Sequence, residues 1–161
     1  MQSTNPTVYI AAPWAEREYA RTVRDQFEAA GIPVLARWLD WTPPEGEEPT
    51  GTNGLDYSDE TLRTEALNDL TDIVKTRIFV LLNTQKRGEE TSGKAVEFGV
   101  ALALAQIQPK GILVVGERTN VFQYLVEQVD TVEDAIQHVL DATKEAKAAP
   151  RIIAPGSKLV H

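Results

Sequence analysis

The stretch from Thr91 to Ala105 places the strongest constraint on how this chain can fold. It reads T-S-G-K-A-V-E-F-G-V-A-L-A-L-A, with hydroxyls and a glycine followed by an almost unbroken apolar run. Good helix formers in such a run predict a buried helix, with Thr91 and Ser92 as candidate N-caps. The apolar part contains one charge, Glu97. A carboxylate in that setting is paired, solvated in a cleft or functional, so Glu97 is a candidate site residue. The structural alternative is pairing with a core arginine or a wet helix edge.

Strand-like and helical segments alternate along the chain. Short β-branched or aromatic runs predict strands at 7–12, 33–36, 77–83 and 111–115, with a very short one at 129–130. Apolar periodicity predicts helices over 15–30, 58–75, 91–105 and 132–142, and a short helix or turn over 121–125. Ser58 and Thr131 are the expected N-caps of the second and last helices.

This alternation predicts the fold class. A strand, a helix and a second strand in succession imply a parallel pair with a right-handed crossover. We therefore predict a single α/β domain over residues 1–161. Its doubly wound, Rossmann-like or flavodoxin-like sheet would have four or five parallel strands, with helices on both faces.

Composition excludes several classes of function. The net charge of −8 argues against a nucleic acid polymer or an anionic membrane surface as partner. The chain has no cysteine and two histidines, which removes thiol nucleophiles and Cys-based zinc sites. No apolar run reaches the length of a membrane span, and no signal peptide is visible, so a cytoplasmic protein is expected.

Cofactor motifs are missing as well. The first strand is followed by A-A-P-W where a dinucleotide-binding chain would carry G-x-G-x-x-G, and no Walker A sequence occurs. We expect neither a cofactor nor a metal.

Residues 37–59 interrupt the alternation. The segment carries three prolines, three glycines, Trp38, Trp41 and Tyr57. A connection this long in a compact domain is usually a lid, a binding loop or disordered, and aromatic residues favour the first two or an oligomer contact. We predict a lid or binding loop at about 37–59. The alternative is that Trp38 and Trp41 simply cap the edge of the sheet.

Ligands of parallel α/β sheets bind beyond the carboxyl ends of the strands. The segments that leave those ends begin at residues 11–14, 37–40, 83–92 and 116–120. Among them, Arg37 and Trp38 are candidate substrate-binding residues. Asp69 lies on an otherwise apolar face of the helix that precedes the central strand, where a carboxyl group is unexpected.

Four segments in order carry a resemblance to a known family. They are V-Y-I-A-A-P, A-L-N-D-L-T-D-I, S-G-K-A-V-E-F-G-V-A-L-A-L-A and G-E-R-T-N-V-F-Q-Y-L, within residues 7–131. They resemble the nucleoside 2-deoxyribosyltransferase family, together with its relatives that hydrolyse the N-glycosidic bond of nucleoside monophosphates. The resemblance implies that Glu97 attacks C1′ of the sugar, that Tyr9 lies beside it, and that Asp69 contacts the base or the sugar. It also implies that Asn120 completes the site of a neighbouring subunit, and hence a homodimer or higher oligomer.

The chain departs from the transferases at Thr91, because the transferases carry an aspartate at this place. A hydroxyl there, followed by glycine, resembles the monophosphate-hydrolysing relatives. Thr91, Ser92 and Gly93 at a helix N-terminus also suit a 5′-phosphate physically, since free N–H groups and the positive dipole end face the anion. Arg37 and Arg118 would add positive charge only if the fold brings them near.

Three functions remain open on the sequence. The leading hypothesis is a deoxyribosyltransferase-like enzyme acting on a nucleoside or nucleotide and a free nucleobase. A (deoxy)nucleoside 5′-monophosphate N-glycosidase is the close alternative. A non-catalytic nucleotide-binding module that uses Glu97 for ribose hydroxyls belongs to another class, and the joint presence of Tyr9, Asp69 and Glu97 favours catalysis over it. The preferred base and the choice between ribose and deoxyribose stay open.

Overall fold

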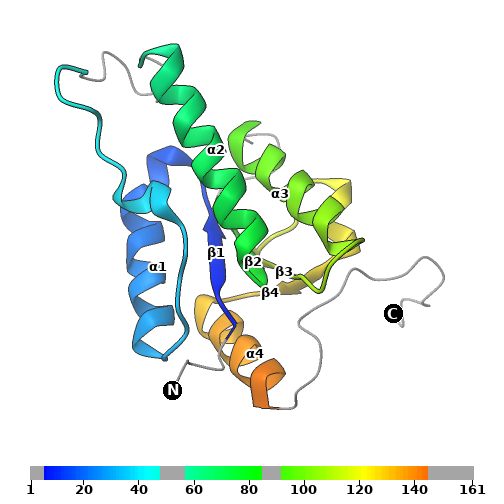
Figure 1. Ribbon diagram of the computed structural model, residues 1–161. Coiled ribbons are helices and arrows are strands. Elements are labelled where there is room, and N and C mark those ends of the chain that lie inside the picture. The colour runs from blue at the N-terminus through cyan, green and yellow to red at the C-terminus, as the bar shows by residue number, and fades with distance from the viewer. Residues whose placement is uncertain (1–5, 48–56, 85–91, 145–161) are drawn as a thin grey trace.

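The computed structural model describes residues 6–47, 57–84 and 92–144, which form one parallel sheet covered by helices (Figure 1). All neighbouring strands run parallel, in the order β1-β2-β3-β4. The strands are β1 (Val8–Ala11), β2 (Ile78–Asn83), β3 (Gly111–Gly116) and β4 (Glu127–Val129). Their largely apolar runs are buried in β1, β2 and β3, as expected of a parallel sheet with two covered faces. The predicted α/β fold class is confirmed.

The strand predicted at 33–36 is reduced to a single bridge. Val34 pairs in parallel with Val8, whose amide donates to Pro33 O and whose carbonyl accepts from Leu35 N, both at 2.9 Å. Pro33 has no N–H to extend the ladder, and the chain turns into the 3₁₀ helix η2 (Arg37–Asp40) directly afterwards. With this bridge counted, the strand order is flavodoxin-like, and the order reverses between β1 and β2.

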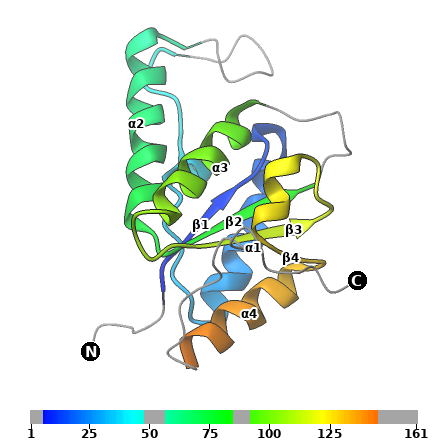
Figure 2. The same cartoon turned by 90° about the vertical axis from the view of Figure 1, so that its right-hand side faces the viewer.

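Helices cover both faces of the sheet (Figure 2). On one face lie α1 (Arg17–Ala29) and α4 (Val132–Lys144), and on the other lie α2 (Asp59–Lys75) and α3 (Ser92–Ala105). Short 3₁₀ helices, η1 (Trp14–Glu16) and η3 (Val121–Leu125), follow β1 and β3. None of the helices within the described ranges is long and apolar enough to cross a membrane.

The expected helix starts are confirmed where they can be seen. Ser58 Oγ accepts from the amide of Thr61 at 3.2 Å, and Thr131 Oγ1 accepts from the amide of Asp134 at 3.1 Å. These bonds satisfy amides that the first helical turn leaves without partners. Thr91, one of the two N-cap candidates for α3, lies outside the described residues.

The described part of the 37–59 segment packs over the carboxyl end of β1. Trp38 is buried and its indole N–H donates to Ile10 O at 2.9 Å. Trp14 contacts both Trp38 and Trp41, with ring centroids 6.3 and 5.8 Å apart, and Trp41 meets Tyr57 edge-on at 4.9 Å. Residues 48–56 of the predicted lid lie outside the described residues, so its function as a lid stays a prediction.

The ends of β2 and β3 are held together closely. Gly116 has a φ of +91°, and a Cβ there would lie 2.7 Å from Asn83 O. Asn83 Nδ2 donates to Glu117 O and to Gln123 Oε1, each at 2.8 Å, and its Oδ1 accepts from Lys94 Nζ at 3.3 Å. These bonds tie the first turn of α3 to the loop after β3, which fixes both beside the carboxyl edge of the sheet.

Candidate active site

A hydrogen bond between β1 and α3 forms the centre of the candidate site. The hydroxyl of Tyr9 donates to Glu97 Oε1 at 2.9 Å, across 88 positions of sequence. Tyr9 is fully buried and stacks on Phe79, its partner in the parallel register, with ring centroids 5.5 Å apart. Phe98 in α3 contacts the same Phe79 ring at 6.3 Å. The aromatic contacts between sheet and helix therefore fix the direction in which the phenol reaches Glu97.

Asp69, on α2, is the second acid of the site. Among the described residues, its buried Oδ1 has no hydrogen-bond partner. The pKa of Asp69 is raised to about 7, chiefly by burial and then by the charges of Glu65 and Asp72, while Arg37 lowers it. Buried polar atoms in native proteins are nearly always satisfied, so an unpartnered carboxyl oxygen marks a place where a ligand or a proton belongs.

Glu97 is perturbed in the same direction. Its pKa is raised to about 8, chiefly by burial and then by the charge of Asp69, while the hydrogen bond from Tyr9 lowers it. Burial and the charges of Glu97 and Asp69 also raise the pKa of the Tyr9 phenol well above its usual value. Tyr9 therefore remains a hydrogen-bond donor at any physiological pH. The carboxyl groups of Asp69 and Glu97, in contrast, gain and lose their protons near neutral pH.

This arrangement can perform acid, base and nucleophilic chemistry. One carboxylate, oriented by a phenol, can attack or stabilise a developing cation, while the second carboxyl group can deliver or accept a proton. Over the described parts of the chain, no group of three or more acidic or histidine side chains is arranged to hold a metal ion.

Two other predicted residues, Arg37 and Trp38, lie on η2, next to α2 and β1. Arg37 binds Asp72 through its backbone amide and Nε, both at 2.9 Å, and also contacts Asn68. Trp38 is held by Ile10 as described above. Both side chains are thus engaged within the protein, and their contact with a substrate stays a prediction.

The remaining predicted residues lie at the start of α3 and after β3. Gly93 is exposed in the first turn of α3, Ser92 is its first residue, and Thr91 is outside the described residues. Asn120 caps η3, since its Oδ1 accepts from the amides of Phe122 at 3.0 Å and Gln123 at 3.3 Å. None of the contacts seen in the described ranges joins Asn120 to Tyr9, Asp69 or Glu97.

Sequence reasoning did not select Trp14 or Asp72. Trp14 is exposed at the carboxyl end of β1, where the guanidinium of Arg17 lies 4.6 Å from the centre of its ring. Its position directly after the first strand was the available signal. Asp72 is buried and bound by Arg37, a pairing for which the local sequence carries no signal.

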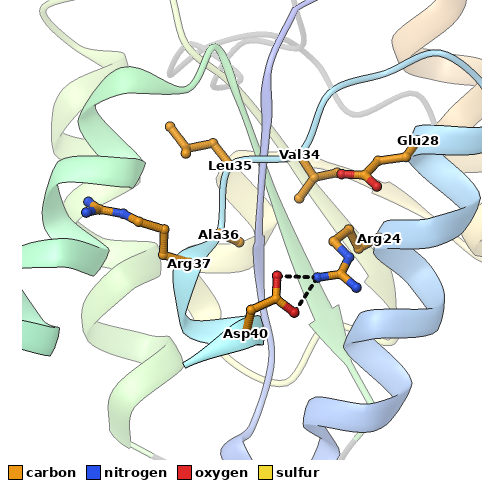
Figure 3. Close-up of a pocket in the computed structure, with 7 residues that line it drawn as sticks. All are labelled: Arg24, Glu28, Val34, Leu35, Ala36, Arg37 and Asp40. Carbon is orange, nitrogen blue, oxygen red and sulfur yellow. Dashed lines mark hydrogen bonds and ion pairs between the residues drawn. The ribbon is translucent and has the colours of Figure 1, made fainter. Parts of the chain in front are cut away.

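A separate cavity of about 360 Å³ lies between α1 and the 34–37 segment (Figure 3). Arg24 closes one side by donating from Nη1 to both carboxylate oxygens of Asp40 at 2.7 Å. The cavity is lined by Arg24, Glu28, Val34, Leu35, Ala36, Arg37 and Asp40. They include none of Tyr9, Asp69 and Glu97, so this cavity is distinct from the candidate site.

Comparisons with known proteins include a distant structural likeness. No family model matches the chain, and no curated protein matches it. Among solved structures, the chain is similar to the CMP N-glycosidase BcmB of Clostridium botulinum, with 16% sequence identity and a TM-score of 0.46. That similarity covers 84% of this chain and 98% of the other.

The raised pKa values of Asp69 and Glu97 predict that replacing either acid by its neutral amide stabilises the folded protein, and that this gain depends on pH. The folded protein holds these protons up to pH 7–8, whereas the unfolded chain loses them near pH 4. The contribution of these two acids to native stability therefore falls as pH rises from about 4 to 8. We expect Asp69→Asn and Glu97→Gln each to raise the free energy of unfolding, and to do so by about 3 kcal/mol more at pH 8 than at pH 5.

Urea denaturation at the two pH values measures this difference. Asp130→Asn, an exposed acid after β4, is the matched control and should show no such pH dependence. A gain of equal size at pH 5 and pH 8 would contradict the assignment of raised pKa values to the pair.

Proposed function

We propose that this protein is an enzyme that cleaves the N-glycosidic bond of a (deoxy)nucleoside or nucleotide through a glycosyl intermediate on Glu97. The observation that carries the proposal is the constellation of Tyr9, Glu97 and Asp69. A phenol donates to one carboxyl group, and a second carboxyl group carries a buried oxygen without a partner among the described residues. Binding alone would not require two acids with raised pKa values in one site.

The chemistry follows from the roles these groups can take. Glu97 attacks C1′, the electron pair of the C1′–N bond passes to the base, and the base takes a proton from Asp69. The transition state resembles an oxocarbenium ion, so the charge on Glu97 stabilises it before the covalent bond is complete. Tyr9 orients Glu97 throughout and stabilises the carboxylate when the sugar leaves.

The second half-reaction reverses the first with a new acceptor. A free nucleobase or water attacks C1′, Asp69 accepts the proton of that nucleophile, and the bond to Glu97 breaks. We propose sugar transfer to a second base as the principal reaction, with hydrolysis as the outcome when water is the acceptor. Incubation with deoxynucleosides and deoxynucleotides, with and without a second free base, separates the two.

Removing the nucleophile gives the first test. Glu97→Ala should lower kcat/KM by at least about a thousandfold while the protein stays folded, because the group that stabilises the transition state is lost. A slow 2′-fluoro substrate should leave a glycosyl adduct on Glu97 of the unchanged protein, seen by mass spectrometry. Glu28→Ala, an exposed acid on α1, is the control and should keep full activity. Turnover close to normal in Glu97→Ala would sink the mechanism.

The start of α3 decides between a nucleoside and its 5′-monophosphate. The positive end of the helix dipole and an exposed Gly93 suit a phosphate, whereas a carboxylate at position 91 would repel it. Thr91→Asp should lower kcat/KM for the monophosphate by about tenfold or more, leaving the nucleoside nearly unaffected. Thr91→Ser, which keeps the hydroxyl, is the control. If the ratio of the two substrates is the same in all three proteins, the phosphate pocket lies elsewhere.

We further propose a homodimer or a larger closed oligomer in which Asn120 serves the neighbouring site. Four large apolar side chains after Asn120 are exposed, and a cluster of this kind on a surface marks a contact with a partner. They are Val121, Phe122, Tyr124 and Leu125.

Mixing two inactive variants tests whether Asn120 acts in trans. Subunits of Glu97→Ala and Asn120→Ala, unfolded and reassembled together, form hybrids in which one site is intact. In a dimer this should restore about a quarter of the wild-type activity. Light scattering on Phe122→Asp should show loss of assembly. A fully active monomer, or a mixture that stays inactive, would refute the proposal.

A further inference from the structure

Helix α2 presents three acids on one face. Glu65, Asp69 and Asp72 are spaced by four and three residues, which places them in one row along the helix. Glu65 and Asp72 both raise the pKa of Asp69 through their charges. A row of acids around a candidate proton donor would hold its proton too tightly for catalysis unless a cation offsets them.

Arg37 is the cation that faces this row. It belongs to η2, which packs against α2. Its backbone amide donates to Asp72 Oδ2 and its Nε to Asp72 Oδ1, both at 2.9 Å, while Nη2 lies 2.8 Å from Oδ1. Asp72 is 1% exposed, and a buried carboxylate of this kind needs a charged partner. Arg37 meets that need with a fork of donors that a lysine could not provide.

The same guanidinium also binds the residue next to Asp69. Nη1 donates to Asn68 Oδ1 at 3.0 Å and Nη2 to Asn68 O at 3.1 Å, while Asn68 Nδ2 donates to Glu65 Oε1 at 3.2 Å. Figure 3 shows Arg37 on the opposite side of the 34–37 segment from Arg24 and Asp40. All three nitrogens of the guanidinium are thus occupied by groups of α2, and little is left for a substrate phosphate.

We propose that Arg37 is a positioning residue, which acts through Asp72 and Asn68 to fix the turn of α2 that carries Asp69, and that it does not contact substrate. Its importance for turnover rests on the proposed function. This role replaces the one that the sequence suggested for Arg37, as a candidate substrate-binding residue at a strand exit.

The proposal has an electrostatic consequence that can be measured without activity. The groups that influence Asp69 are Glu65 and Asp72 on α2 and Arg37 on η2, and its own charge acts on Tyr9 of β1 and Glu97 of α3. Of these, Arg37 lowers the pKa of Asp69. Without Arg37, the charge of Asp72 would be unopposed, so Asp69 should hold its proton to a higher pH.

Carbon-13 NMR of the side-chain carboxyl groups tests this in the intact protein, with the Asp69 signal identified from Asp69→Asn. In Arg37→Gln the titration midpoint of Asp69 should rise by about half to one pH unit. Arg63 is an exposed arginine on α2, the helix that carries Asp69. Arg63→Gln removes the same charge and should move the titration midpoint of Asp69 by less than about 0.2 pH units. The double variant Arg37→Gln/Asp72→Asn removes both charges and should return the midpoint close to its original value. A midpoint that does not move in Arg37→Gln overturns the proposal.

Kinetics separate positioning from substrate contact. Arg37→Gln should lower kcat for a deoxynucleoside and for its 5′-monophosphate by the same factor, whereas a phosphate contact would raise KM for the monophosphate alone. The double variant retains a neutral hydrogen-bonding pair, so it gives the same comparison if the single variant does not fold. A selective loss of activity on the monophosphate overturns the proposal. If the unchanged protein turns over neither the deoxynucleoside nor its 5′-monophosphate, the proposed function fails. The NMR titration still decides the role of Arg37 in that case.

Discussion

The hydrogen bond from Tyr9 to Glu97 is the interaction on which the candidate site depends. It joins the first strand to a largely apolar helix, and it gives the carboxylate of that helix a defined partner. The parallel pairing of β1 with β2 is required for it, because Phe79 of β2 supports the phenol ring from one side and touches Phe98 of α3. A change in strand register would therefore move the phenol away from the acid.

A phenol is a weak compensation for a buried carboxylate. An arginine partner would have lowered the pKa of Glu97, as the structural alternative from the sequence required, whereas burial and Asp69 together raise it to about 8. Two acids kept in this state reduce the stability of the native fold near neutral pH. Proteins retain such unfavourable arrangements where chemistry needs them, which is why the pair favours a catalytic over a structural interpretation.

The sequence was sufficient for the fold because its signals are local. Within the described residues, apolar runs and helical periodicity located the four strands and the four α-helices, although β4 lies at Glu127–Val129, slightly before the prediction. The 3₁₀ helix η2 was not predicted. The strand at 33–36 failed because Pro33 and the turn into η2 leave room for one bridge only. Arg37 and Asp72 illustrate the limit for the site. Their contact depends on how η2 packs against α2, and nothing in the pattern around either residue indicates the other.

In the proposed reaction, the distribution of charge in the site also explains why Arg37 would matter for turnover. Attack on C1′ needs Glu97 ionised, and the hydrogen bond from Tyr9 lowers the pKa of Glu97 against the larger, opposite effect of burial. It also needs Asp69 protonated, which burial of that carboxyl group favours. When the base departs with the proton, Asp69 becomes negative beside Glu65 and Asp72. At that moment Glu97 loses its charge to the ester, so the total charge of the two acids stays constant and only its position changes. Arg37, by neutralising Asp72, lowers the energy of the state in which the charge is on Asp69. In the proposed reaction, the ion pair between η2 and α2 would thus act on the step that breaks the glycosidic bond.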